Sequence, residues 1–151
     1  LIEKLAPEEV EAVLAHELGH FKLHHLWQRI AFMAALSLAV LALLGTLITE
    51  PWFFNGLGMS AQDTASALAL FLFALPVFSF PLTPLASLWS RVHEFQADAY
   101  AARHARAADL VSALVRMYRD NAGTLTPDPL YSAFYDSHPP APIRIARLER
   151  A

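Results

Sequence analysis

Residues 30–49, IAFMAALSLAVLALLGTLIT, form a run of 20 positions without a charged side chain. A helix rises about 1.5 Å per residue, so a run of this length extends roughly 30 Å, the hydrocarbon thickness of a bilayer. Such runs are typical of membrane spans, although a buried helix of a soluble protein is an alternative interpretation. The run predicts a membrane-spanning helix at residues 28–49.

A second uncharged run covers residues 64–90 and predicts another span at residues 65–88. Three prolines interrupt it, at positions 76, 81 and 84. Because proline removes a helical hydrogen bond, we expect a kink or an early end of this helix.

Charge separates the middle of the chain from its ends. Between residues 30 and 90 only Glu50 and Asp63 are charged, and the other 23 charged side chains lie outside this stretch. The fold class that this pattern predicts is all-α, a helical membrane protein with a two-span hairpin flanked by polar helices. The net charge of -3, without a Lys or Arg cluster, argues against a nucleic-acid partner, and the absence of cysteine excludes thiolate zinc sites and disulfides.

The charges beside the two runs predict an orientation. The connecting loop, residues 50–63, contains no Lys or Arg, whereas Lys22, Arg29 and Arg91 lie at the opposite ends of the spans. The positive-inside rule then places both polar ends of the chain in the cytoplasm.

The polar ends are predicted to be helical. One helix begins at Pro7 and passes directly into the first span, because no Gly-Pro break separates them. One or two helices follow from Arg91 to near Gly123. Residues 124–142 are predicted to be a loop, and Pro142 to begin a last short helix.

The sharpest local pattern is HELGH at residues 16–20. Residues four apart share a helix face, so His16 and His20 can bind one zinc ion. Glu17 between them is suited to act as general base on a water molecule and to deliver the proton to the leaving amine, which is the chemistry of a metallopeptidase.

The third ligand is chosen by elimination. His24 lies eight residues from His16, about 12 Å along the helix axis, which is too far to share the metal, so His24 and His25 are expected at the membrane interface or beside the ligands. Glu94 follows the second span, and Asp98 lies one helical turn further on. We predict that Glu94 completes a two-His, one-Glu site and that Asp98 orients a ligand histidine. Taken alone, Glu94 and Asp98 are better interpreted as an exposed acidic face that pairs with Arg91 or Arg103. The HELGH motif reverses this preference, because the hairpin returns the chain to the side of His16 and His20.

Three motifs together resemble a known family. HELGH after a PEEVEAVLA-like helix, EFQADAYAA after a two-span hairpin, and SHPP at residues 137–140 followed by Arg144 resemble the integral-membrane zinc metalloendopeptidases of the type I CaaX prenyl protease group. The HtpX heat-shock proteases are relatives of that group. The resemblance covers nearly the whole chain, and the SHPP motif with Arg144 favours the CaaX branch.

The resemblance implies the same zinc ligands, base and orienting carboxylate as the motif spacing, and one zinc ion per chain. It adds His138 and Arg144 as active-site groups. His138 is suited to donate a hydrogen bond to the developing oxyanion or to the substrate carbonyl, and Arg144 to hold it or to bind a carboxylate. A structural histidine in a Pro-rich turn is the alternative for His138.

The resemblance also implies a larger assembly. Residues 1–151 are expected to be one metallopeptidase catalytic domain, the C-terminal part of a longer chain whose upstream helices help to enclose a chamber. The expected partners are a peptide or protein substrate and the lipid bilayer. The Ala-, Leu- and Arg-rich, Lys-poor composition favours a bacterial inner membrane, with the zinc site on its cytoplasmic side.

Three alternative functions differ from this one. The first is an HtpX-like protease for membrane protein quality control, and the second is a non-catalytic membrane scaffold stabilised by zinc, in which Glu17 would not be needed. The third, an intramembrane zinc protease, is disfavoured because the HELGH motif has polar flanks and no Asp-Gly sequence occurs in the chain.

Overall fold

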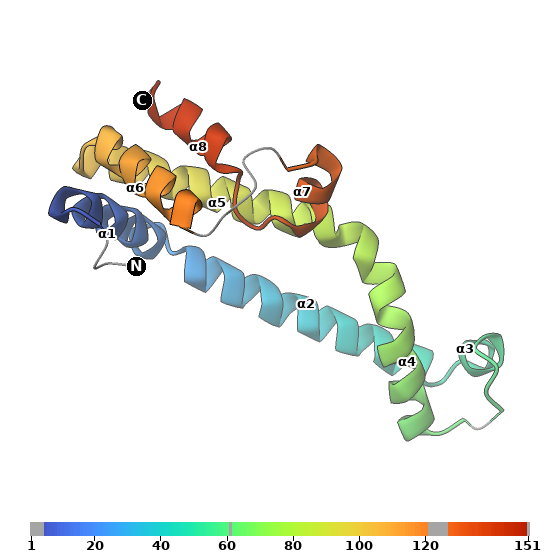
Figure 1. Ribbon diagram of the computed structural model, residues 1–151. Coiled ribbons are helices and arrows are strands. Elements are labelled where there is room, and N and C mark those ends of the chain that lie inside the picture. The colour runs from blue at the N-terminus through green and yellow to red at the C-terminus, as the bar shows by residue number, and fades with distance from the viewer. Residues whose placement is uncertain (1–4, 61, 121–126, 151) are drawn as a thin grey trace. The chain divides into compact units, whose positions relative to one another are not determined.

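In the computed structural model, which describes residues 5–60, 62–120 and 127–150, every regular element is a helix. The helices follow one another along the chain in Figure 1. They are α1 (Pro7–Lys22), α2 (His25–Leu47), α3 (Pro51–Gly56), α4 (Thr64–Ser79), the 3₁₀ turn η2 (Phe80–Leu82), α5 (Thr83–His104), α6 (Ala107–Asp120), α7 (Pro129–Tyr135) and α8 (Ala141–Leu148). The prediction of an all-α fold is confirmed.

Contacts divide the chain into two compact units. Unit 1 comprises Leu1–Leu26 together with Thr83–Ala151, and unit 2 is the intervening segment Trp27–Leu82. The apolar middle of the sequence therefore forms a unit of its own, inserted between the two polar segments that build unit 1.

Helix α1 begins as its sequence predicts, with Pro7 at the first position and acidic residues in the first turn. The carboxylate of Glu9 accepts a hydrogen bond from the Ala6 N–H at 2.8 Å and another from the Ser112 hydroxyl at 2.5 Å. Arg116 lies 3.0 Å from the same carboxylate. One buried glutamate thus caps α1 and ties it to α6.

The expectation that α1 continues into the first span is wrong. Helix α1 ends at Lys22, where the Leu23 N–H donates to the carbonyl of Gly19 and the His24 N–H to that of Phe21. His24 has a φ of 58°, the left-handed conformation that ends helices without needing a glycine or a proline. A new helix, α2, begins at His25.

The apolar core of unit 1 is small. It consists of buried residues from α1, α5, α6 and α8, namely Ala12, Ala101, Leu110, Leu114 and Leu148. Alanines at the centre allow the helices to approach closely, and α1 packs mainly against α5 and α6.

The region between α6 and α8 contains more helix than predicted. Residues 129–135 form α7, because Asp128 accepts hydrogen bonds from the N–H groups of Leu130 and Tyr131 and Pro129 occupies the first helical position. The last helix, α8, begins at Ala141, one residue before the predicted Pro142. The predicted helix end near Gly123 lies outside the described residues.

Unit 2 is built from α2, α3 and α4 around a buried cluster of Phe53, Phe54, Ala67 and Phe71. Two stretches, His25–Leu47 and Thr64–His104, are long and apolar enough to cross a membrane. The predicted early helix end is confirmed, since α4 ends at Ser79 and a 3₁₀ turn containing Pro81 follows it. The predicted connecting loop contains the short helix α3.

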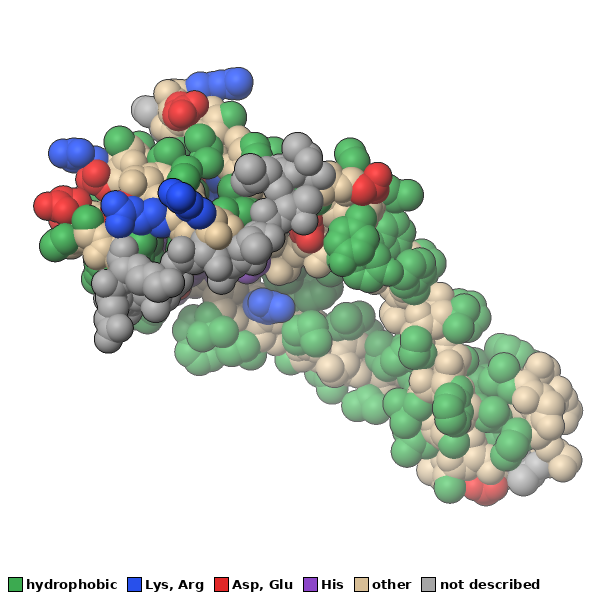
Figure 2. All heavy atoms as spheres, viewed as in Figure 1, with side chains coloured by type: hydrophobic (Ala, Val, Ile, Leu, Met, Phe, Trp, Pro, Cys, Tyr) green, Lys and Arg blue, Asp and Glu red, His purple; other side chains and the backbone are tan. Residues whose placement is uncertain are grey.

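The apolar surface of unit 2 faces outward. Within the apolar window of α2 no residue is buried, and large side chains such as Leu38, 69% exposed, and Leu41, 60% exposed, project from it. Figure 2 shows hydrophobic side chains over much of the visible surface of α2 and α4. Surfaces of this kind are rare on soluble proteins and suit contact with lipid or with other apolar helices.

Candidate metal centre and active site

The HELGH motif lies on α1 at a close contact with α5. A Cβ atom added to Gly19 would lie 3.1 Å from the Cα of Ala97 and 3.1 Å from the Cβ of Tyr100. Since real Cβ atoms rarely come so close to backbone, the absence of a side chain at Gly19 permits the contact. The glycine inside the motif therefore brings its histidines within reach of the carboxylates on α5.

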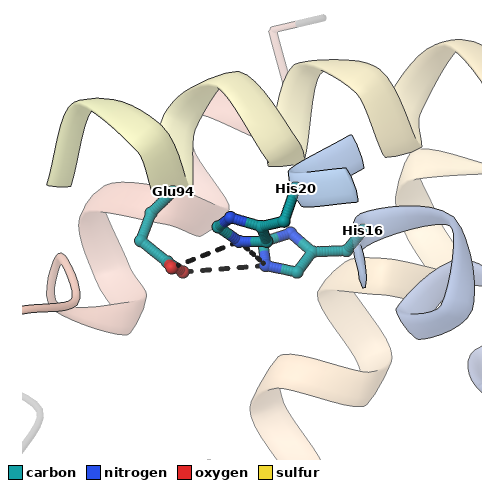
Figure 3. A group of neighbouring side chains, drawn as sticks. All are labelled: His16, His20 and Glu94. Carbon is teal, nitrogen blue, oxygen red and sulfur yellow. Dashed lines mark hydrogen bonds and ion pairs between the residues drawn. The ribbon is translucent and has the colours of Figure 1, made fainter. Parts of the chain in front are cut away.

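Three predicted ligands converge at this contact. His16 and His20 project from α1 towards Glu94 on α5, as Figure 3 shows. The Nε2 atoms of the two histidines are 3.2 Å apart. Glu94 places Oε1 3.4 Å from His20 Nε2 and Oε2 3.7 Å from His16 Nε2.

The size of this triangle fits a zinc ion. Ligands held about 2.0–2.1 Å from a tetrahedral ion lie roughly 3.3–3.4 Å from one another, close to the three separations of 3.2, 3.4 and 3.7 Å. In addition, the buried Oε2 atom of Glu94 accepts no well-aligned hydrogen bond within the described part of the chain. The nitrogens nearest to Oε2 outside the triangle, His138 Nδ1 at 3.0 Å and Arg144 NH1 at 3.4 Å, are ion-pair neighbours without hydrogen-bond alignment. A buried carboxylate beside two imidazole nitrogens suits a cation.

His20 is suited to metal binding by its environment. Burial lowers the pKa of His20, and the neighbouring His16 lowers it further, so the neutral imidazole is favoured. The neutral ring is the form that carries a lone pair for a metal.

Asp98 lies beside His16, where it is predicted to orient that ligand. Its Oδ1 atom is 3.0 Å from His16 Nδ1, on the side of the ring opposite to Glu94. A proton on Nδ1 donated to Asp98 leaves Nε2 free to face the ligand triangle.

Arg144 is buried and holds Asp98 with two contacts. Its Nε atom donates to Oδ2 at 2.8 Å and its NH2 group to Oδ1 at 2.5 Å, while NH1 lies 3.4 Å from Glu94 Oε2. Burial would raise the pKa of Asp98, but hydrogen bonds from His16 and Arg144 outweigh it and lower this pKa. Arg144 therefore keeps Asp98 ionised and ready to accept from His16.

His138 reaches the centre from the segment between α7 and α8. Its Nδ1 atom is 3.0 Å from Glu94 Oε2, although the side chain remains 66% exposed. The contact raises the pKa of His138, and the same imidazole, with Arg144, lowers the pKa of Glu94 against the opposing effect of burial. His138 is thus an accessible imidazole at the edge of the site, and its protonated form is favoured by Glu94.

Glu17, between the two histidines, is exposed. Its negative charge acts to raise the pKa of His20 and the pKa of His138. A cavity of about 320 Å³ opens beside His138 and is lined by Tyr118, Tyr131 and Tyr135 among others. The exposed carboxylate of Glu17 is accessible to water, and the cavity beside His138 has room for a substrate side chain.

The structure brings together the predicted ligands, Asp98, His138 and Arg144. Sequence reasoning left His25 either at the membrane interface or beside the ligands, and its Nδ1 atom lies 2.9 Å from Nδ1 of His20. It missed Gln96, which lies 2.9 Å from His25. The only sequence signal for Gln96 was its place two residues after Glu94 in the second motif.

Comparisons with known proteins cover the whole chain. The sequence model of peptidase family M48 matches residues 1–151. The chain is 38% identical over 148 residues to the CAAX prenyl protease 1 homologue of Arabidopsis thaliana and 37% identical over 146 residues to that of Mus musculus. These matches cover 94% and 95% of this chain but 34% and 31% of the relatives, so the chain spans about a third of their length.

A solved structure shares the fold. The crystal structure of S. mikatae Ste24p matches with a TM-score of 0.85 and 28% sequence identity, over 99% of this chain and 38% of that chain. The arrangement of helices described above is therefore found within a larger known protein.

Proposed function

The chain belongs to peptidase family M48, and we propose that it is the catalytic part of a membrane zinc metalloendopeptidase of the CaaX prenyl protease type. The observation that carries this proposal is the triangle of His16, His20 and Glu94, with Glu17 exposed beside it. A zinc ion held there supplies Lewis acidity, which acidifies water and polarises a carbonyl group.

Glu17 is the general base in this proposal. Its exposed carboxylate takes a proton from the attacking water and delivers it to the leaving amine. The negative charge of Glu17 favours the protonated form of His138, which keeps a donor near the reacting carbonyl. The accessible imidazole of His138 donates to the oxyanion as negative charge develops there.

Arg144 has a different role from His138. Its guanidinium is directed at Asp98 and lies near Glu94, so it binds a carboxylate of the protein itself. Arg144 acts by fixing Asp98, which in turn orients His16. The Tyr-lined cavity beside His138 is available for a substrate side chain next to the scissile bond.

The proposed substrate is a peptide or protein presented at the membrane surface. The relatives named above are CAAX prenyl proteases, and cleavage of a CaaX-type peptide by the full-length protein is the finer form of the proposal. Unit 2, with its outward apolar side chains, anchors the protein in the bilayer. Upstream helices of the longer chain complete the chamber.

The positive-inside pattern supports a cytoplasmic placement of the centre, because Lys22, Arg29 and Arg91 lie on its side of the spans. A bacterial inner membrane remains a prediction from composition alone. The relatives named above come from a plant and a mammal.

The test uses the full-length, detergent-solubilised protein. Glu17→Gln is expected to keep one zinc ion and to lose roughly 10²–10⁴-fold in kcat for peptide cleavage, because the base is removed while the ligands remain. His16→Ala is expected to lose the zinc. Glu11→Gln, which changes another exposed glutamate of α1, is the matched control and retains activity.

Two results would reject the proposal. A wild-type protein without zinc after purification in zinc-containing buffer would exclude the metal centre. Normal cleavage by Glu17→Gln would exclude this residue as the base and would favour a scaffold that binds zinc for stability.

A further inference from the structure

His25 is a buried histidine that the proposed reaction does not use. It is the first residue of α2, and only 4% of its surface is exposed. Its ring lies parallel to that of His93 on α5, with the ring centroids 4.1 Å apart and 3° between the planes. Burying an imidazole costs free energy unless its nitrogens are hydrogen-bonded, so the partners of both nitrogens are informative.

Both nitrogens of His25 have partners. Nδ1 lies 2.9 Å from Nδ1 of His20, and Nε2 lies 2.9 Å from Oε1 of Gln96. His25 therefore connects a predicted metal ligand on α1 to a polar side chain on α5.

The donors and acceptors along the series His20, His25 and Gln96 follow from the chemistry of Gln96. Its Oε1 atom only accepts, so the proton of His25 resides on Nε2. The Nδ1 atom of His25 then carries a lone pair and accepts the proton on Nδ1 of His20. With its proton on Nδ1, His20 presents the lone pair of Nε2 to the ligand triangle, which is the tautomer that a metal requires.

The break between α1 and α2 makes this contact possible. In an uninterrupted helix, a residue five positions after His20 would lie about 140° around the axis and about 7.5 Å along it, facing away from the His20 ring. The left-handed turn at His24 changes the direction of the backbone, so that α2 begins with the His25 ring in contact with the His20 ring. The left-handed φ at His24 thus places a hydrogen-bond partner beside a proposed metal ligand.

Each histidine of the motif then has its own support. His16 donates to Asp98, which Arg144 holds, and His20 donates to His25, which Gln96 fixes. The first support is charged and buried. The second is neutral, and its outer end at Gln96 is exposed.

We propose that His25 is a positioning residue that fixes the tautomer and ring orientation of His20 for zinc binding. This inference rests on the proposed metallopeptidase function. It assigns His25 no contact with the metal or the substrate.

The test compares two substitutions of nearly equal size in the full-length protein. His25→Asn keeps an acceptor near the position of Nδ1, whereas His25→Leu removes it. Loss of a partner that orients a metal ligand typically costs 10–100-fold in metal affinity, so His25→Leu is expected to weaken zinc binding by about that factor. His25→Asn is expected to stay within a few-fold of wild type.

The readouts are zinc affinity, from competition with a chelator, and the visible spectrum of the cobalt-substituted protein. We expect a changed cobalt spectrum in His25→Leu and a spectrum close to wild type in His25→Asn. His24→Asn is the matched control, because it removes the adjacent exposed histidine and Asn tolerates a left-handed φ. It is expected to keep wild-type affinity.

The outcomes separate the two proposals. A wild-type protein that binds no zinc overturns the metallopeptidase function itself. A wild-type protein that binds zinc, with His25→Leu equal to it in affinity and cobalt spectrum, overturns only the role of His25. Equal losses in His25→Leu and His25→Asn also overturn it, since the acceptor would then be irrelevant.

A second measurement needs no variant and guards against misfolding of His25→Leu. Nitrogen-15 NMR of histidine-labelled wild-type protein distinguishes protonated from unprotonated ring nitrogens. We expect a protonated Nδ1 in His20 and an unprotonated Nδ1 in His25. A proton on Nδ1 of His25 would contradict the proposal.

Discussion

Units 1 and 2 differ in the polar side chains that they bury. In unit 1, Glu9, Glu94, Asp98 and Arg144 are all buried, together with His16. In unit 2, the buried cluster is made of phenylalanines and an alanine, and the large aliphatic side chains of α2 point outward. Both units bury an apolar cluster, but within the described residues only unit 1 buries charged side chains, and unit 2 carries many large apolar side chains on its surface.

The two units are therefore stabilised in different ways. Buried charges are tolerated only when they are paired and hydrogen-bonded, so unit 1 depends on specific partners. An exposed apolar face is favourable only in apolar surroundings, so unit 2 depends on its solvent. Loss of a buried ion pair should therefore destabilise unit 1, whereas a charge placed on the apolar face should affect unit 2.

The largest effect is expected from Arg144→Met, which removes the guanidinium that pairs with the buried carboxylate of Asp98. Breaking a buried ion pair by removing one partner typically costs about 3–5 kcal/mol. The free energy of unfolding of the zinc-free protein, from denaturant titration, measures this. The double variant Arg144→Met, Asp98→Leu should recover part of the loss, because no unpaired charge remains. A single variant as stable as wild type would show that the pair contributes little.

Leu38→Arg places a charge on the exposed apolar face of unit 2. A charged residue at the centre of a span costs about 2.5–3.5 kcal/mol of insertion free energy, so the fraction of chains with α2 inserted should fall. A membrane insertion assay based on glycosylation sites measures this fraction. Leu38→Ala is the control for lost volume, and Glu11→Arg places the same charge on an exposed position of unit 1 without effect. Full insertion of Leu38→Arg would mean that this face contacts water or polar protein.

Gly19→Ala is expected to have a smaller effect, about 1–3 kcal/mol, because a Cβ atom at this position meets the backbone of Ala97 at 3.1 Å. It should also weaken zinc binding, since α1 carries two of the proposed ligands and α5 carries the third. Gly45→Ala in α2 is the matched control. Its Cβ would meet nothing within 4 Å, so this change should be neutral or slightly stabilising. Equal effects of both substitutions would contradict the close contact of α1 and α5.

Much of this arrangement is predictable from local sequence. Pro7 indicates the start of α1, and the helical spacing of His16 and His20 is enough to place them on one face. The long uncharged runs suffice to separate unit 2 from the rest. These features depend on residues close together in the chain, where periodicity and capping decide the structure.

The remainder depends on tertiary contacts or on unusual backbone. A left-handed φ is uncommon for any residue with a side chain, and glycine or asparagine is the usual occupant of such a turn, so the sequence did not indicate one at His24. Helix α7 was missed because Pro and Asp are frequent in loops, yet here Asp128 caps a helix that Pro129 begins. The direction of Arg144 towards Asp98 joins residues 46 positions apart, and no spacing rule extends so far.

The smallest effect is expected at Glu9, whose buried carboxylate stabilises unit 1 far from the metal centre. The Ser112 hydroxyl and the Ala6 N–H lower the pKa of Glu9 below its usual value, so folding favours the ionised form. A lowered pKa adds stability above the unfolded pKa, about 4.3, and this stability is lost as the pH falls through the folded pKa. Glu9→Gln should therefore be less stable than wild type at pH 7, and the difference should shrink below roughly pH 4.

Denaturant titrations of the zinc-free protein between pH 7 and pH 3 measure this difference. Glu8→Gln, at the neighbouring exposed position of the same helical turn, is the matched control and should give a smaller difference at pH 7. A gap between wild type and Glu9→Gln that stays constant down to pH 3 would mean that ionisation of Glu9 is not what ties α1 to α6. Unit 1 would then depend on the neutral hydrogen bonds of Glu9, which glutamine partly retains, and the contrast with unit 2 would rest on the metal centre alone.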